Sequence, residues 1–125
     1  MLKFGKKKYT MEGNVDSGRT KIRKKGEYCI LCPGSELSMI EDAGRILENM
    51  QTLHAAGNKK ICVDLTMSPV INSSVIGALI AFNNEMEKSG GELVILNARN
   101  VALETMVRSH INRVIRFIRD EDELA

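Results

Sequence analysis

Two adjacent serines carry the most suggestive chemistry in this chain of 125 residues. Ser73 and Ser74 follow Asn72 and precede a long apolar run. All three are residue types favoured at helix N-caps, because their side-chain oxygens accept hydrogen bonds from amides that the first turn leaves unpaired. A phosphate on either hydroxyl would lie in the positive field of those amides and of the helix dipole. The tripeptide predicts a charge switch, with plain helix capping as the alternative.

The sequence lacks the groupings that catalysis would require. Neither histidine, His54 or His110, stands at ligand spacing or beside a nucleophile with an orienting acid, and no Gly-rich phosphate-binding loop is present. Ser73 and Ser74 have no obvious general base. We therefore expect a protein that is not an enzyme and that needs no cofactor, no metal and no small-molecule substrate.

The three cysteines predict a reduced core rather than a redox or zinc site. Cys29 and Cys32 form a C-x-x-C sequence, and Cys62 is the third cysteine. The pair lies in a strand-like run, where residues three apart point to opposite faces, so a shared metal or disulfide would need a turn there. Their odd number, with no secretory pattern and no apolar run long enough to span a membrane, indicates the cytoplasm.

Apolar periodicity predicts three helices. One begins near Ser38, where Ser38-Met39-Ile40-Glu41 matches a capping box, and ends near Gly57. The second begins near Ser74 and ends before Gly90, and the third runs from Val101 to His110. The residues expected to face the core are Ile40, Ala43, Leu47, Met50 and Leu53 in the first helix, Val75, Ile76, Leu79, Ile80, Phe82 and Met86 in the second, and Leu103, Met106 and Val107 in the third.

The intervening apolar runs predict strands. Residues 61–65 and 93–96 are short, strongly apolar and each followed by a helix, as expected of central parallel strands. Gly26 separates the basic run 20–25 from the apolar run 28–32, which indicates a hairpin with its basic strand at the sheet edge. Residues 114–118 predict a short last strand. The expected fold is α/β, a mixed sheet of four or five strands with crossover helices packed against it.

Residues 1–19 are expected to form a basic, flexible arm before a single domain spanning residues 20–125. Half of the 18 lysines and arginines lie before Gly26, so the net charge of +2 conceals a basic N-terminus on an acidic body. Such an arm could bind nucleic acid, anionic lipid or an acidic partner, or simply keep the domain soluble.

Taken in order, the motifs resemble the STAS domain of bacterial anti-sigma factor antagonists. Val63-Asp64-Leu65 is similar to the family's strand ending in Asp-Leu, and Asn72 to Leu79 is similar to its Asp-Ser-Ser/Thr-Gly-Leu-Gly helix start. Gly90 to Asn97 resembles its Gly-Gly-x-Leu-x-Leu strand, and Pro33 to Leu37 resembles the end of its second strand. The resemblance extends from about residue 20 to the C-terminus, and it implies a STAS-like fold.

The resemblance also implies a function, that of a partner-switching regulator. Such a protein binds an anti-sigma factor or a GHKL-type serine kinase, and a phosphoserine at the helix start blocks that contact. It implies Ser74 as the acceptor, with Ser73 open, and a switch loop that includes Asp64, Asn72 and Val75. Asn72 stands where the family has Asp, and Val75 stands where it has Gly.

The sequence leaves two other functions open. One is a STAS adaptor that uses the same surface without phosphorylation, and the other is a nucleic-acid-associated protein that uses the basic arm. Asp64, polar at the end of an apolar strand, is expected to face the rim or to bond amides near residues 72–74, with a purely structural cap of its own loop as the alternative.

Overall fold

The central sheet consists of an antiparallel hairpin followed by three parallel strands. The computed structural model describes residues 3–4, 7–8, 14–15 and 20–124. The strands are β3 (Asn14–Val15), β4 (Thr20–Lys25), β5 (Tyr28–Cys32), β6 (Lys60–Asp64), β7 (Glu92–Leu96) and β8 (Arg116–Ile118), which lie in that order across the sheet. β4 pairs antiparallel with β5, whereas β5 to β8 are parallel neighbours. The predicted mixed sheet is confirmed, with the two-residue β3 added beside β4.

The hairpin between β4 and β5 depends on Gly26. Lys25 pairs with Tyr28, which leaves Gly26 and Glu27 in the turn, and Gly26 has a φ of 60°. This left-handed conformation costs glycine little because it has no Cβ. At the other end of β4, β3 pairs only with Thr20 and Lys21. Within the described residues, β4 therefore has an unpaired edge only over residues 22–25.

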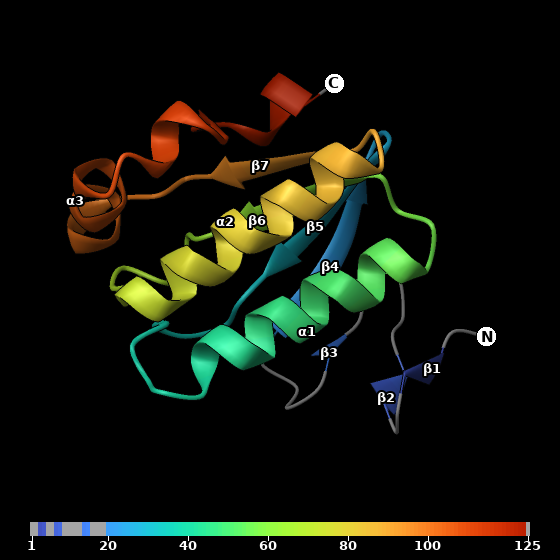
Figure 1. Ribbon diagram of the computed structural model, residues 1–125, viewed down its shortest axis with the longest axis horizontal. Coiled ribbons are helices and arrows are strands. Elements are labelled where there is room, and N and C mark those ends of the chain that lie inside the picture. The colour runs from blue at the N-terminus through green and yellow to red at the C-terminus, as the bar shows by residue number, and fades with distance from the viewer. Residues whose placement is uncertain (1–2, 5–6, 9–13, 16–19, 125) are drawn as a thin grey trace.

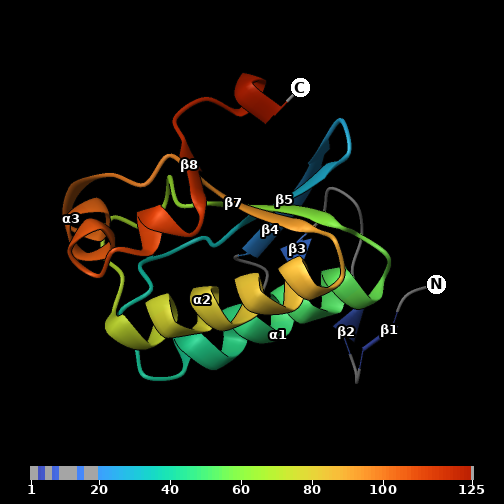
Figure 2. The ribbon, with the colours of Figure 1, turned by 45° about the horizontal axis from the view of Figure 1, so that its top comes forward.

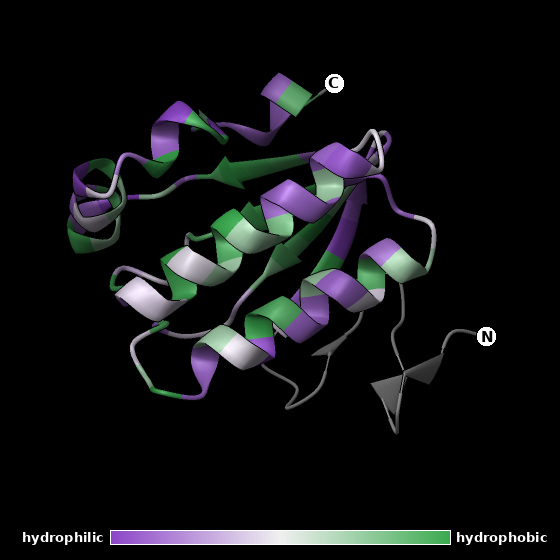
Figure 3. Ribbon diagram, viewed as in Figure 1, coloured by the Kyte–Doolittle hydropathy of each residue, from purple (hydrophilic) through white to green (hydrophobic). Residues whose placement is uncertain are grey.

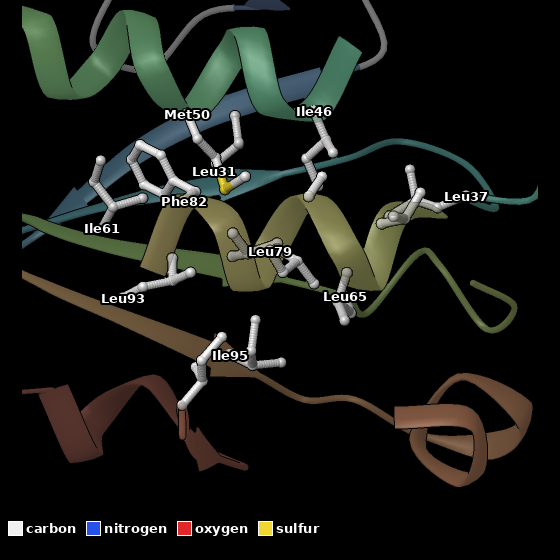
Figure 4. Packing of buried hydrophobic residues seen from close by; sticks show 14 of the residues in the cluster. Leu31, Leu37, Ile46, Met50, Ile61, Leu65, Leu79, Phe82, Leu93 and Ile95 are labelled. Atoms are coloured by element: carbon white, nitrogen blue, oxygen red, sulfur yellow. The ribbon is translucent and has the colours of Figure 1, made fainter. Parts of the chain in front are cut away.

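Two helices cover one face of the sheet. They are α1 (Asp42–Ala55) and α2 (Ser73–Lys88), which lie side by side in Figure 1 and on the same side of the strands in Figure 2. Both follow parallel strands, and their apolar faces pack against the sheet. Met50 from α1, Phe82 from α2 and Leu31 from β5 are fully buried and lie close together in Figure 4. This cluster is the main core.

The opposite face of the sheet carries a smaller apolar cluster. Its members are Tyr28, Ile30, Cys62, Val94, Leu96, Ile118 and Leu124. Leu124 belongs to η2 (Glu121–Leu124), a short 3-10 helix on the side of the sheet away from α1 and α2 in Figure 2. Figure 3 shows the strong contrast between the hydrophobic central strands and the hydrophilic β4. We call the sheet face opposite α1 and α2 the second face.

The last strand, β8, forms the edge of the sheet beside β7, and the third helix precedes it in the chain. α3 (Asn100–Arg108) is followed by the 3-10 turn η1 (Ile111–Arg113) and then by β8. In α3, Ala102 and Met106 are buried, whereas Val107 is 45% exposed. The prediction that Val107 faces the core is therefore wrong, because only one side of this nine-residue helix contacts the rest of the protein.

The first helix begins later than predicted. α1 begins at Asp42, and the capping box at Ser38 and Glu41 does not form, since the N-cap residue Glu41 makes no side-chain capping bond. Instead, Asp42 Oδ2 accepts a hydrogen bond from the Met39 amide at 2.8 Å and fixes a turn before the helix. Ile40, predicted to face the core, lies in that turn and is 92% exposed.

Cys29 and Cys62 lie in the core as predicted, but the prediction of a buried Cys32 is wrong, because Cys32 lies at the end of β5 where the core no longer covers it. Cys29 faces the helices and Cys62 lies on the second face, both buried, whereas Cys32 is partly exposed and unlike Cys29 belongs to neither apolar cluster. All three are free thiols. Among the helices of the described ranges, none has the length and apolar character to cross a bilayer.

The predicted arm lies mostly outside the described residues. In that region the structure describes β3 and a separate two-stranded sheet, β1 (Lys3–Phe4) with β2 (Lys7–Lys8). The flexible arm over residues 1–19 stays a prediction.

Candidate functional site

α2 begins at the predicted serine pair, and Asn72 is its N-cap. Asn72 is extended, with φ −96° and ψ 168°, and its side-chain Oδ1 accepts a hydrogen bond from the Val75 amide at 2.9 Å. Ser73 and Ser74 form the exposed first turn. Within residues 20–124 neither serine hydroxyl makes a hydrogen bond, because Asn72 already provides the cap. Both hydroxyls are therefore available for modification or for contact with a partner.

Backbone bonds between two loops hold this helix start in place. The Leu37 amide donates to the Val70 carbonyl at 3.0 Å, and the Asn72 amide donates to the Leu37 carbonyl at 2.9 Å. The Asn72 side chain also donates through Nδ2 to the Met39 carbonyl at 3.1 Å. The loop after β5 therefore runs beside the loop after β6, and Asn72 joins both loops to α2.

Four exposed apolar side chains lie on segments that backbone hydrogen bonds tie to the start of α2 or to one another. Met39 is 58% exposed and Ile40 92%, both in the loop that bonds Asn72, and Met67 in the loop after β6 is 56% exposed. Val101, at the start of α3, is 51% exposed. We call these four residues the apolar rim. The start of α2, the loop after β5 and α3 gather at one end of the molecule in Figure 1.

A backbone hydrogen bond connects the part of the apolar rim on α3 with the part on the loop after β6. The Ala102 amide of α3 donates to the Pro69 carbonyl at 2.8 Å, which ties α3 to the loop after β6. Several large apolar side chains exposed on neighbouring segments are a feature of protein interaction sites. Sequence analysis missed the rim because Ile40 and Met39 were interpreted as part of a helix.

Val75 packs the start of α2 against the main core. Its side chain has no exposed surface and belongs to the main core, so only its amide takes part in the site, as the donor to Asn72. The substitution of valine for the family's glycine thus adds no bulk to the surface beside Ser74.

Asp64 caps its own loop. The residue is 5% exposed, and its Oδ1 accepts hydrogen bonds from the Thr66 amide at 2.9 Å and the Thr66 hydroxyl at 2.6 Å. Oδ2 accepts from the Arg23 guanidinium at 3.1 Å. The expectation that Asp64 bonds amides near residues 72–74 is therefore wrong, because strand alternation points its side chain to the second face.

A polar network that sequence analysis missed extends from Asp64 in two directions. Arg23 also donates to Glu121 at 2.5 Å, and the Thr66 hydroxyl accepts a hydrogen bond from Asn97 at 2.7 Å. Burial alone would lower the pKa of Arg23, but its hydrogen bonds to Glu121 and Asp64 raise it overall. The spacing of charges along β4 and the run of four acids from 120 to 123 were the available signals for this network.

The described residues hold no arrangement that resembles a hydrolytic or metal site. His54 Nε2 lies 2.9 Å from Ser89 Oγ, but that hydroxyl donates its proton to the Met86 carbonyl at 3.0 Å and so serves the end of α2. Among residues 20–124, no group of three or more histidine, cysteine, aspartate or glutamate side chains could hold a metal ion. What the serine site offers is two free hydroxyls beside an apolar surface.

Solved structures with the same fold include several anti-sigma factor antagonists. A Thermotoga maritima protein assigned as one is 19% identical, with a TM-score of 0.77 over 84% of this chain and 90% of that chain. A Mycobacterium paratuberculosis anti-sigma factor antagonist is 15% identical, with a TM-score of 0.72 over 83% and 87%. At these identities the likeness concerns the fold.

SpoIIAA, a Bacillus cell fate determinant, shares the fold as well. Its phosphorylated form is 16% identical, with a TM-score of 0.63 over 84% of this chain and 96% of that chain. A comparison with curated proteins finds no match. The model of the STAS domain matches residues 19–124, nearly the whole chain. The chain therefore belongs to the STAS domain family.

Proposed function

We propose that this protein is a partner-switching regulator of the anti-sigma factor antagonist type. Its partner, an anti-sigma factor or serine kinase, docks on the start of α2 and the apolar rim, and phosphorylation of Ser74 or Ser73 releases it. The observation that carries the proposal is the pair of exposed, unbonded serine hydroxyls at the start of a 16-residue helix. Solved structures of the same fold include SpoIIAA in its unphosphorylated and phosphorylated forms.

The start of α2 suits a phosphate electrostatically. Its first turn contains no acidic residue, and its N-cap, Asn72, is neutral. A phosphate on Ser74 would be stabilised by the helix dipole and free amides without like-charge repulsion from the cap. The same two negative charges would oppose an apolar or acidic partner surface. The switch thus acts on binding and leaves the fold intact.

The two departures from the family pattern are compatible with this function. Asn72 keeps the capping role because its Oδ1 supplies the same kind of acceptor as a carboxylate, at 2.9 Å from the Val75 amide. Val75 is fully buried, so a partner's backbone can approach Ser74 as it would beside glycine. Neither substitution changes the surface that a partner would meet, apart from the charge at Asn72.

The apolar rim supplies the binding energy in this proposal. Met39, Ile40 and Met67 are each more than half exposed. Methionine adapts to varied apolar surfaces, and burial of such residues is the main favourable term in association. A phosphorylation-independent adaptor would use the same rim, and it differs only in the absence of control through Ser73 and Ser74.

The test is binding of full-length variants to the partner captured from an extract of the native cell. We expect Ser74→Asp to bind at least tenfold more weakly than wild type while its melting temperature stays within about two degrees. Asn84→Asp is the matched control, since it adds the same charge to an exposed position of α2 away from the start. Ile40→Ser should also weaken binding without loss of stability.

Two further measurements distinguish the alternatives. Mass spectrometry of protein from its native host should find phosphate on Ser74 or Ser73. If Ser74→Asp binds like wild type and no phosphate is found, the adaptor replaces the switch. If neither Ser74→Asp nor Ile40→Ser affects the partner, the proposed surface is wrong. Salt-dependent binding to duplex DNA would support the nucleic-acid alternative.

A further inference from the structure

The acidic residues after β8 fold back on the second face of the sheet. We call residues 120–124 the tail segment. Glu121 accepts a hydrogen bond from Arg23 at 2.5 Å, and Asp122 accepts one from Lys25 at 3.1 Å. Both cations project from the same side of β4, two residues apart. A basic strand therefore holds an acidic segment that is separated from it by almost the whole chain.

An apolar contact completes the attachment. Leu124 is 7% exposed and packs in the second-face cluster with Tyr28, Ile30 and Cys62. Beside it lies a hollow of about 480 Å³, bordered by Tyr28, Lys60, Arg116 and Leu124 together with residues of the β4–β5 turn. The surface under the tail segment thus offers two cations, Arg23 and Lys25, and an apolar cluster that contacts Leu124. It also has unfilled space beside Leu124.

The attachment is limited in extent. η2 has only four residues, and Leu124 is its one buried residue. The Lys25–Asp122 pair lies at the surface, with Asp122 78% exposed, and the Arg23–Glu121 pair is about one-third exposed on both sides. Exposed ion pairs contribute little and are screened by salt. A segment held in this way can exchange with a competitor of the same chemistry.

We propose that the second face is a binding site for acidic peptide segments, and that the tail segment occupies it in the resting protein. The contacts define the ligand pattern as two successive acidic residues, one intervening residue and then an aliphatic residue, as in Glu121-Asp122-Glu123-Leu124. The acids bind Arg23 and Lys25, and the aliphatic side chain enters the apolar cluster. A partner segment of this pattern displaces the chain's own. This site lies on the face opposite α1 and α2 and does not depend on the proposed switch.

A labelled peptide tests the proposal in the full-length protein. The probe is fluorescein-labelled Arg-Asp-Glu-Asp-Glu-Leu-Ala, the sequence of residues 119–125, and the readout is fluorescence anisotropy. A full-length variant with Glu121→Gln, Asp122→Asn and Leu124→Ala has an open site, so we expect it to bind the peptide at least tenfold more tightly than wild type does. The matched control carries Glu87→Gln, Glu104→Gln and Val107→Ala, which likewise remove two negative charges and shorten one aliphatic side chain, at exposed positions elsewhere.

Charge and shape are then tested separately. Lys25→Glu in the triple variant should weaken binding at least tenfold, and so should a peptide in which serine replaces leucine. Where the triple variant fails to fold by circular dichroism, Leu124→Ala alone takes its place. The proposal is overturned if wild type and open variant bind the peptide within threefold of each other, or if the serine peptide binds as well as the parent.

Discussion

The two faces of the sheet are built on different principles. The face under α1 and α2 is lined by aliphatic side chains and Phe82, whose burial follows from the period of each helix and strand. The second face combines a smaller apolar cluster with charged side chains from β4, β6, β7 and β8, and the short helix η2 packs on it. One face is specified locally, and the other is specified by pairs of residues far apart in the chain.

The polar contacts of the second face show how long-range its specification is. Arg23 bonds Asp64 and Glu121, which are 41 and 98 residues away. Tyr28 donates a hydrogen bond to Glu92 and accepts one from Arg116 at 3.2 Å. No helical or strand period relates these positions. The helix-covered face therefore sets the fold, whereas the second face joins β4 to the segment after β8.

The largest difference between the faces should appear when one leucine on each is truncated. Leu79→Ala leaves a cavity between α2 and the sheet, so we expect a loss of roughly 2–5 kcal/mol in the free energy of unfolding. Leu124→Ala should cost no more than about 1.5 kcal/mol, because the short tail segment can shift to fill the space or detach. Urea titration measures both values. Equal losses would mean that both faces are packed as a single core.

The next largest effect concerns Asp64, which joins the second face to the loop after β6. Asp64→Ala removes two bonds to Thr66 and the pair with Arg23, and we expect a loss of about 2–3 kcal/mol, since hydrogen bonds to charged groups contribute roughly 1.5–3 kcal/mol. Arg23 is 37% exposed and can return to water, which limits the loss.

A double-mutant cycle isolates the ion pair from the loop contacts. With Arg23→Met as the second change, the coupling between the two positions should be about 1 kcal/mol. A coupling near zero would show that Asp64 acts only as the cap of its own loop, and that the pair with Arg23 adds nothing to stability.

The same contrast explains what sequence reasoning predicted. The strands, the crossovers and the start of α2 follow from local patterns, such as the run 61–65 and the capping residues at 72–74. Of the candidate site, the sequence predicted the capping tripeptide at residues 72–74. Its neighbours were not, because Ile40 satisfied a helical period while the Asp42 carboxylate, bonded to the Met39 amide, placed it in a turn.

The partners of Asp64 illustrate the remaining error. The residue was correctly singled out as a costly polar group at the end of an apolar strand, but its partner was sought in the next loop. Arg23 comes from the hairpin before it, and only the register of β4, β5 and β6 brings the two together. Sequence alone does not supply that register.

A smaller effect is expected at the local cap of α2. Asn72→Ala removes the acceptor for the Val75 amide and should cost about 1 kcal/mol, within the range of 0.5–2 kcal/mol for N-caps. Ser74→Ala should change stability by less than about 0.5 kcal/mol, because Ser74 is exposed and does not cap the helix. Thermal melts of the two variants measure the difference. A larger loss of stability for Ser74→Ala than for Asn72→Ala would show that Ser74, and not Asn72, caps the helix.

The smallest effect, on thiol reactivity, shows whether the two faces open separately. At pH 8 we expect Cys32, which is partly exposed, to react first with a thiol reagent, followed by Cys62 and then Cys29. Cys62 needs only release of the tail segment and its neighbours, whereas Cys29 lies under the helices. Burial, and then the nearby Asp64 carboxylate, raises the pKa of Cys62 to about 12, so its labelling rate should keep rising up to that pH.

The same pKa shift predicts how stability depends on pH. The thiol of Cys62 ionises near pH 9.0 in the unfolded chain and near pH 12 in the folded protein. The folded state therefore binds its proton more tightly, and the associated stability is complete below about pH 9 and is lost as the pH rises toward 12.

Peptide mapping of labelled thiols between pH 8 and pH 10 tests the order of opening. Equal rates for Cys62 and Cys29 at every pH would mean that the second face opens only when the whole domain unfolds, and the distinction between the two faces would then be one of composition and not of stability.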